Sequence, residues 1–168
     1  LYIASFGAAN QGPPQVARLR PLDLFTLNDT VLPSAIGALQ TPLHYAEGLV
    51  AQSDGENMFV LHQTTPAVIA RVDRQSFVTR GTVSLPEQST ALSMEEDDDY
   101  LFVVAHTAPG SIFKYDKKDL DAEVVPYDKG TLNQDAQWPM ASTSDKNYLY
   151  IVTRPYANPN PKPAKLLQ

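Results

Sequence analysis

An internal repeat is the feature that most limits how this chain of 168 residues can fold. A basic residue recurs at Arg18, Arg71 and Lys114, each with a proline five residues before it and a β-branched residue two residues before it. A second, aromatic column has a mean period of about 49 residues, which is in the range of repeat proteins; its members are Tyr2, Phe59, Phe102 and Tyr150. Columns that share one period indicate repeated units that bury their apolar faces against each other.

Residues 91–126 contain the clearest copy of the unit and predict short strands separated by turns. The acidic residues 95–99 and the Thr-Ala-Pro-Gly sequence at 107–110 are typical of turns. The segment YLFVVA between them is rich in aromatic and β-branched residues, so we expect a strand buried on both faces. Pro126 ends the last strand because proline cannot donate to a ladder. The four strands are expected at residues 92–94, 100–105, 111–116 and 122–125.

The same pattern organises the rest of the chain. Residues 48–86 form one further complete unit. An incomplete unit precedes it, with strands expected at residues 1–5, 15–19 and 24–32, and residues 138–153 supply the first two strands of another. Residues 33–47 are a longer connection, in which residues 34–39 are compatible with a short helix that Gly37 weakens. Residues 154–165 are rich in proline and predict an extended tail or linker.

These columns resemble the β-propeller repeats of the surface-layer or YVTN type, whose units read "polar turn, LYV, loop, I-x-[KR]-[IVY]-D, F, V-x-L-P". The match is carried by residues 100–104, 112–116 and 124–126 and their copies, although Arg20 stands where other units have Asp73 and Asp116. The resemblance implies an all-β fold in which each unit of about 43–57 residues is one four-stranded antiparallel blade. Residues 1–153 would then be about three and a half blades of a larger propeller, and residues 154–168 a Pro-rich tail.

Consecutive blades of a propeller cover each other's faces. The resemblance therefore implies that six apolar residues are buried between blades: Leu61, Leu101, Val103, Ile112, Tyr115 and Ile151. The outermost units would expose apolar faces, which predicts a partner, either other protein subunits or the remainder of a longer chain. Propeller repeats specify a blade and leave the function open.

Composition excludes several classes of function. The formal net charge is −6, without the basic patch that binds nucleic acid. There is no cysteine, so disulfides, thiolate nucleophiles and cysteine-based zinc sites are absent. No run of 18 apolar residues that could span a membrane is present. The sequence also lacks the Gly-x-Ser-x-Gly, Walker, dinucleotide-binding and His-Glu-x-x-His motifs.

The acidic residues 95–99 are the candidate metal site, with Glu95, Asp97 and Asp99 as oxygen ligands for Ca²⁺. They lack the spacing and the glycine of an EF-hand loop. Polar turns at 53–55 and 144–146 occupy the equivalent positions in other units, which favours a solvated turn over a calcium site. We therefore predict no resident cofactor or metal, with Ca²⁺ as the alternative.

His62 and His106 end equivalent strands, where they could form a metal or general-base pair. They are one residue out of register, and His44 lies in the long connection, so a structural role is favoured for all three. Trp138 is compatible with a ligand platform or with core packing. The basic column of Arg18, Arg71 and Lys114 is expected on a strand face rather than in an anion site.

The sequence thus predicts a non-catalytic structural or protein–protein interaction module, extracellular or surface-associated. Two alternatives stay open: a propeller-type enzyme, such as a lactonase-like hydrolase or an oxidoreductase, and a carbohydrate-binding propeller that uses exposed aromatics such as Tyr156. The Asn-Asp-Thr triplet at Asn28 is a formal glycosylation acceptor. We predict a glycan on Asn28 if the chain passes through a eukaryotic secretory route, which intact mass would detect.

Overall fold

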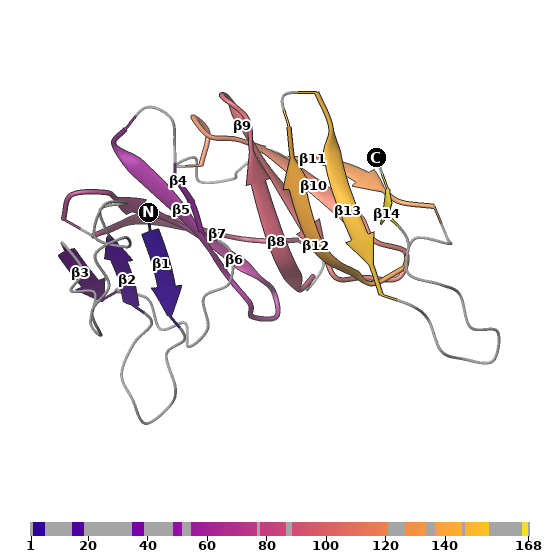
Figure 1. The fold of residues 1–168 in the computed structure, drawn as a ribbon, viewed down its shortest axis with the longest axis horizontal. Coiled ribbons are helices and arrows are strands. Elements are labelled where there is room, and N and C mark those ends of the chain that lie inside the picture. The colour runs from indigo at the N-terminus through magenta and orange to yellow at the C-terminus, as the bar shows by residue number, and fades with distance from the viewer. Residues whose placement is uncertain are drawn as a thin grey trace, which may run out of the picture.

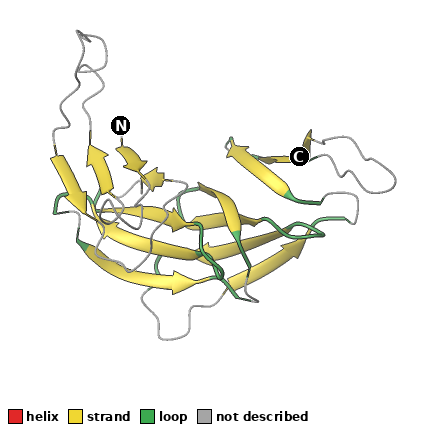
Figure 2. Cartoon of the chain, turned by 90° about the horizontal axis from the view of Figure 1, so that it is seen from below, coloured by secondary structure: helices red, strands yellow, loops and turns green. Residues whose placement is uncertain are grey.

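A computed structural model of the chain has an all-β fold, as the repeat predicts. It describes residues 2–5, 15–18, 35–38, 49–51, 55–76, 78–86, 89–120, 127–133, 137–145, 147–154 and 166–167. Strands and turns make up these ranges, and they contain no helix (Figure 2). The described strands form several antiparallel sheets without a closed ring.

Four sheets follow one another along the chain (Figure 1). Sheet 1 contains β1 (Tyr2–Ser5), β2 (Gln15–Arg18) and β3 (Ala35–Ala38). Sheet 2 contains β4 (Leu49–Ala51), β5 (Asn57–His62), β6 (Val68–Asp73) and β7 (Thr79–Ser84). Sheet 3 contains β8 (Ala91–Glu96), β9 (Tyr100–Ala105), β10 (Ser111–Asp116) and β11 (Tyr127–Thr131). Sheet 4 contains β12 (Pro139–Ser144), β13 (Leu149–Thr153) and β14 (Leu166–Leu167). Within each sheet the strands lie in chain order, so every sheet is a meander.

The repeat columns of the sequence occupy one register in the first three sheets. The basic residue is the Cα partner of the aromatic residue on the neighbouring strand each time: Tyr2↔Arg18, Phe59↔Arg71 and Phe102↔Lys114. A slip of one residue would turn every side chain of a strand to the opposite face. The shared register therefore means that the three sheets present equivalent positions on equivalent faces.

The turn that precedes the basic strand is repeated as well. Thr64 Oγ1 donates to the carbonyl oxygen of Pro66 at 2.5 Å, and Thr107 Oγ1 donates to that of Pro109 at 2.8 Å. Both prolines follow a cis peptide bond. Pro66 and Pro109 of the proline column thus occupy one recurring turn, and Pro13 lies outside the described residues.

The last strand of each unit differs from the expectation. The segments predicted for it, residues 24–32 and 122–125, lie outside the described residues. The strands that pair with the basic strands are β3, at the position considered for a short helix, and β11, which begins after Pro126. The backbone N–H and C=O groups of β3 pair with those of β2, so the prediction of a short helix at residues 34–39 was wrong. Tyr127 is the first residue of β11, and Pro126 lies outside the described residues.

Two further boundaries were wrong or missed. β8 includes Glu95 and Glu96, which are paired with Phe102 and Leu101, so the acidic turn begins only at Asp97. Leu166–Leu167 form a short strand that pairs with β13, inside the segment assigned to the tail. This third strand of the last sheet carries no basic residue, so the sequence column could not reveal it.

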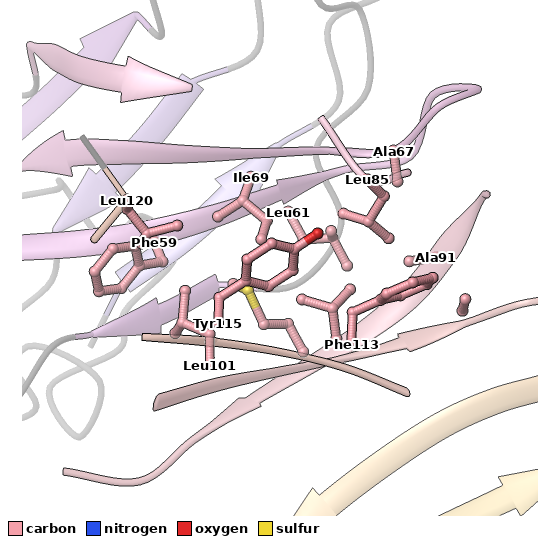
Figure 3. Packing of buried hydrophobic residues seen from close by; sticks show 13 residues of the cluster. Phe59, Leu61, Ala67, Ile69, Leu85, Ala91, Leu101, Phe113, Tyr115 and Leu120 are labelled. Atoms are coloured by element: carbon pink, nitrogen blue, oxygen red, sulfur yellow. The ribbon is translucent and has the colours of Figure 1, made fainter. Parts of the chain in front are cut away.

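Sheets 2 and 3 pack face to face and enclose the main apolar core (Figure 3). Of the residues expected to be buried, five are buried as predicted: Leu61, Leu101, Val103, Tyr115 and Ile151. Ile112 is only half-buried, because the alternation of β10 turns Phe113 and Tyr115 inward and Ile112 to the opposite face. Figure 3 shows Tyr115 projecting from β10 toward Leu61 and Ile69 of sheet 2.

Tyr115 buries its hydroxyl group without a hydrogen-bond partner among the described residues. Burial raises the pKa of this phenol, so it stays neutral. A buried donor that lacks a partner costs about 1–3 kcal/mol, part of which a cavity offsets when the oxygen is removed. We expect Tyr115→Phe to raise the free energy of unfolding by about 1 kcal/mol, measured by urea denaturation. Tyr148→Phe is the control, because it removes the hydroxyl group of an exposed tyrosine and should leave stability unchanged; a Tyr115→Phe protein less stable than wild type would contradict the prediction.

Candidate functional site

The three candidate calcium ligands have different partners. Asp97 Oδ1 accepts the backbone N–H groups of Asp99 and Tyr100 at 2.9 and 2.7 Å, which closes the turn. Asp99 is exposed and accepts from Lys118 Nζ at 3.3 Å. Glu95 points from β8 toward sheet 4 instead. Across the described ranges, no three His, Asp or Glu residues are grouped closely enough to hold a metal ion.

A buried lysine further defines the acidic turn. Lys117 Nζ donates to Glu96 Oε2 at 2.6 Å and to the carbonyl oxygen of Asp97 at 2.5 Å. The ammonium group is almost fully buried, so its charge is balanced by Glu96 at close range. The turn therefore already contains a cation from its own chain. A turn of the same geometry follows β12, where Asp145 Oδ1 accepts from the N–H groups of Asn147 and Tyr148.

Glu95 lies in the interface between sheets 3 and 4. Its carboxylate accepts hydrogen bonds from the hydroxyl groups of Ser142 at 3.3 Å and Ser144 at 3.1 Å. Loss of solvent raises the pKa of Glu95, and the two serine donors oppose that rise. The folded state therefore binds this proton more tightly than the unfolded state. The protonated Glu95 side chain therefore contributes to the free energy of unfolding at low pH, and this contribution is lost as the pH rises through the raised pKa.

We expect Glu95→Gln to stabilise the protein at neutral pH and to flatten the decline of stability from acidic to neutral pH. The amide keeps an acceptor oxygen for the serines and avoids the buried charge. Melting temperature between pH 4 and pH 8 measures this (roughly the range over which a raised carboxyl titrates). Glu96→Gln is the matched control and should destabilise at neutral pH, because it removes the charge that balances Lys117. Equal melting curves for wild type and Glu95→Gln at every pH would refute the effect.

His106 and Trp138 join the edges of sheets 3 and 4. His106 Nδ1 lies 2.8 Å from the carbonyl oxygen of Pro139, to which it donates, and its ring lies 5.0 Å from that of Trp138. The backbone N–H of Trp138 donates to the carbonyl oxygen of Thr107 at 3.0 Å, and Trp138 has a φ of 52°. His106 and Trp138 thus pack against each other where sheets 3 and 4 meet, and both are half-buried rather than part of the core.

His62 is completely buried at the end of β5. His44, Tyr156 and Asn28 lie outside the described residues. In the basic column, Lys114 Nζ lies 3.7 Å from the centre of the Tyr100 ring, a cation–π contact on the strand face. Arg71 lies beside a polar hollow of about 340 Å³ at the turn edge of sheet 2.

That hollow is lined by two arginines and two carboxylates together with uncharged groups: Gly55, Glu56, Asn57, Arg71, Asp73, Gln75 and Arg80. Arg80 Nη2 donates to Asp73 Oδ2 at 2.5 Å, and this contact, followed by the N–H of Ser76, holds the pKa of Asp73 well below its usual range. The formal charges of the lining balance. The hollow has polar binding capacity without a nucleophile and base at hydrogen-bond distance among the described residues.

The outward side of sheet 4 is an uncharged surface, which we call the outer face: Ala141, Thr143, Tyr150, Val152 and Leu166. The register places them together, because Thr143 pairs with Tyr150, and Val152 pairs with both Ala141 and Leu166. Val152 is 44% exposed and Leu166 is 70% exposed. The alternate residue Ile151 points to the other side and is buried. The sequence predicted that an outermost unit would expose an apolar face; the structure places this exposure at Val152 and Leu166 and buries Ile151.

No protein-family model matches this chain, and no curated protein matches it. Within the part of the chain that the structure describes, no helix has the length and apolarity needed to cross a membrane. The outer face is therefore the candidate functional site, on the strength of its geometry alone.

Proposed function

We propose that this chain is a non-catalytic structural or protein–protein interaction module, built of propeller-type blades of the surface-layer or YVTN kind, in an extracellular or surface-associated assembly. The blade assignment is supported by the shared register of the repeat columns and by four antiparallel meanders arranged in series (Figure 1). The extracellular assignment rests on the resemblance to surface-layer repeats and on the acidic composition, and the acceptor triplet at Asn28 agrees with it.

One comparison between equivalent residues carries the interaction role. Leu61 and Ile69 are a cross-strand pair in sheet 2, and Val152 and Leu166 are the same pair in sheet 4. The first pair is 0% and 1% exposed because sheet 3 covers it, whereas the second pair is open to solvent. Uncovered apolar residues at a position that the fold otherwise buries are typical of a surface that binds protein.

Photocrosslinking tests this role. Val152 is replaced by benzoylphenylalanine in the cells that produce the protein, which are then irradiated. We expect protein adducts from position 152, because the photoreactive group would lie within an interface. Lys118, whose side chain is 80% exposed on the acidic turn, is the control position. Protein adducts at position 152 no more abundant than those at position 118 would overturn the proposal.

A further inference from the structure

We infer that the partner on the outer face is a second copy of this chain, which docks with its sheet 1; this inference rests on the proposed function and names the partner. Each sheet has two sides that the repeat distinguishes. The leading face contains the aromatic column, such as Phe59 and Phe102. The trailing face contains the residues next to that column, such as Leu101 and Ile151. The outer face of sheet 4 is its leading face, because it contains Tyr150.

In the contact between sheets 2 and 3, the leading face of sheet 2 packs on the trailing face of sheet 3. The core cluster between them combines leading-face residues of sheet 2, Phe59, Leu61 and Ile69, with trailing-face residues of sheet 3, among them Leu101 and Val103. The alternation of each strand fixes these sides.

Sheets 3 and 4 are joined in the same way. Ser93 and Glu95 share the leading face of sheet 3, because they pair with Val104 and Phe102. They accept hydrogen bonds from Ser142 and Ser144, which share the trailing face of sheet 4 with Ile151 and Leu149. Two successive interfaces of one chain therefore follow one rule. The surface that fits an uncovered leading face is the trailing face of another sheet of this repeat.

The chemistry of the two sides agrees with this rule. The trailing faces of sheets 2 and 3 have completely buried aliphatic residues at two successive alternate positions: Met58, Val60, Leu101 and Val103. The outer face offers only uncharged side chains to such a surface. A charged partner placed over Val152 and Leu166 would lose its hydration there without gaining a counter-charge, because the carboxylate of Asp145 lies at the edge of the outer face, where it accepts from Tyr150.

Sheet 1 is the unit of this chain that can supply the trailing face. It has the repeat register, and Ile3 stands at the position of Val60, Val103 and Ile151. β1 contacts β4, the edge strand of sheet 2, so sheet 1 is the neighbour of sheet 2 on the side away from sheet 3 (Figure 1). Sheet 2 there has its trailing-face residues Met58 and Val60 buried. By the same rule, the opposite side of sheet 1 is a trailing face.

A leading face on one copy and a trailing face on the next make a heterologous contact. Such contacts form a closed ring when the rotation that relates successive copies adds up to a full turn. The described residues of each copy form four sheets. Two copies bring twice that number together, which is within the four to eight blades of closed propellers. We therefore expect a closed dimer with two identical contacts between sheet 4 of one copy and sheet 1 of the other.

The mass of the 168-residue chain in solution, measured by light scattering, tests the inference. Wild type should have twice the mass of a single chain of 18.5 kDa. Val152→Asp should give single chains with an unchanged circular dichroism spectrum, because it places a carboxylate in the contact. Val78→Asp is the matched control: Val78 is 43% exposed in the turn after β6, away from the outer face, and this variant should stay a dimer.

The identity of the protein that crosslinks to position 152 tests this inference separately from the proposed function. An adduct from position 152 to a peptide from residues 2–18 of a second copy supports it. Wild-type chains that stay single, a Val152→Asp protein that remains dimeric, or an adduct to a different protein would each overturn it. An adduct to a different protein would still leave the chain an interaction module, whereas the absence of any adduct would remove both.

Discussion

Replacing Gly110 with alanine is expected to loosen the contact between sheets 3 and 4 and to lower the melting temperature by several degrees. A Cβ atom at this position would lie 2.5 Å from Pro139 Cγ and 2.9 Å from Leu132 Cδ1. Leu132 can rotate away, but Pro139 cannot, because its ring is rigid and its carbonyl oxygen accepts from His106. Overpacking of this kind costs about 1–3 kcal/mol, or a fall of about 3–10 °C in a chain of this size.

Gly130→Ala is the matched control, because nothing lies within 4 Å of the Cβ position at Gly130. It should melt like wild type. Trp138 is the only tryptophan of the chain and adjoins Pro139, so its fluorescence reports on this contact directly. We expect red-shifted emission for Gly110→Ala and unchanged emission for Gly130→Ala. Identical melting and emission for both variants would show that the contact is not tight at Gly110.

The columns of the repeat correspond to one register of the sheets, because packing and backbone pairing act on the same residues. Phe59 and Arg71 fall in separate columns of the repeat, and the structure makes them cross-strand partners. The strands β9 and β10 have the predicted bounds, since each is fixed by an apolar or alternating pattern between two strong turns. Such segments can pair in only one register, because a slip of one residue would turn their apolar side chains to the solvent.

The last strand of each unit could not be predicted in the same way. All five residues of β11 are exposed, so its sequence contains no burial pattern and its position is set by pairing with β10. The contact between Glu95 and Ser144 was missed for a different reason. These residues are one repeat period apart, and stacking places such residues side by side in neighbouring sheets. The repeat thus contained this signal, but the expected turn at 95–99 concealed that Glu95 lies in a strand.

The repeat predicted that an outermost unit would expose an apolar face, but residue types alone do not tell which side of the sheet is uncovered. Val104 in sheet 3 and Val152 in sheet 4 are the same residue at the same register position. The first is completely buried and the second is largely open. Their environments differ because a sheet follows the first and no described strand covers the second. Exposure here is a property of the arrangement of sheets.

Replacing Val103 with aspartate should abolish cooperative folding, the largest effect that we expect. Val103 is completely buried in the core between sheets 2 and 3, and its cross-strand partners Phe113 and Met94 are buried as well. An unpaired carboxylate at this position would have to lose its hydration or take up a proton, and either costs several kcal/mol. Domains of this kind are stable by about 5–15 kcal/mol in total, so one such charge removes most of the margin.

The measurements are soluble yield and urea unfolding, with two comparison variants. Val103→Ala keeps the site apolar and loses about 1–3 kcal/mol from the cavity, so it should still unfold cooperatively, at lower urea. Val78→Asp introduces the same charge at an exposed valine and should fold like wild type. A soluble Val103→Asp protein with a wild-type urea midpoint would mean that the two sheets do not enclose this residue. The stacking rule would then lose its first interface, since Val103 belongs to the trailing face that covers Leu61 and Ile69.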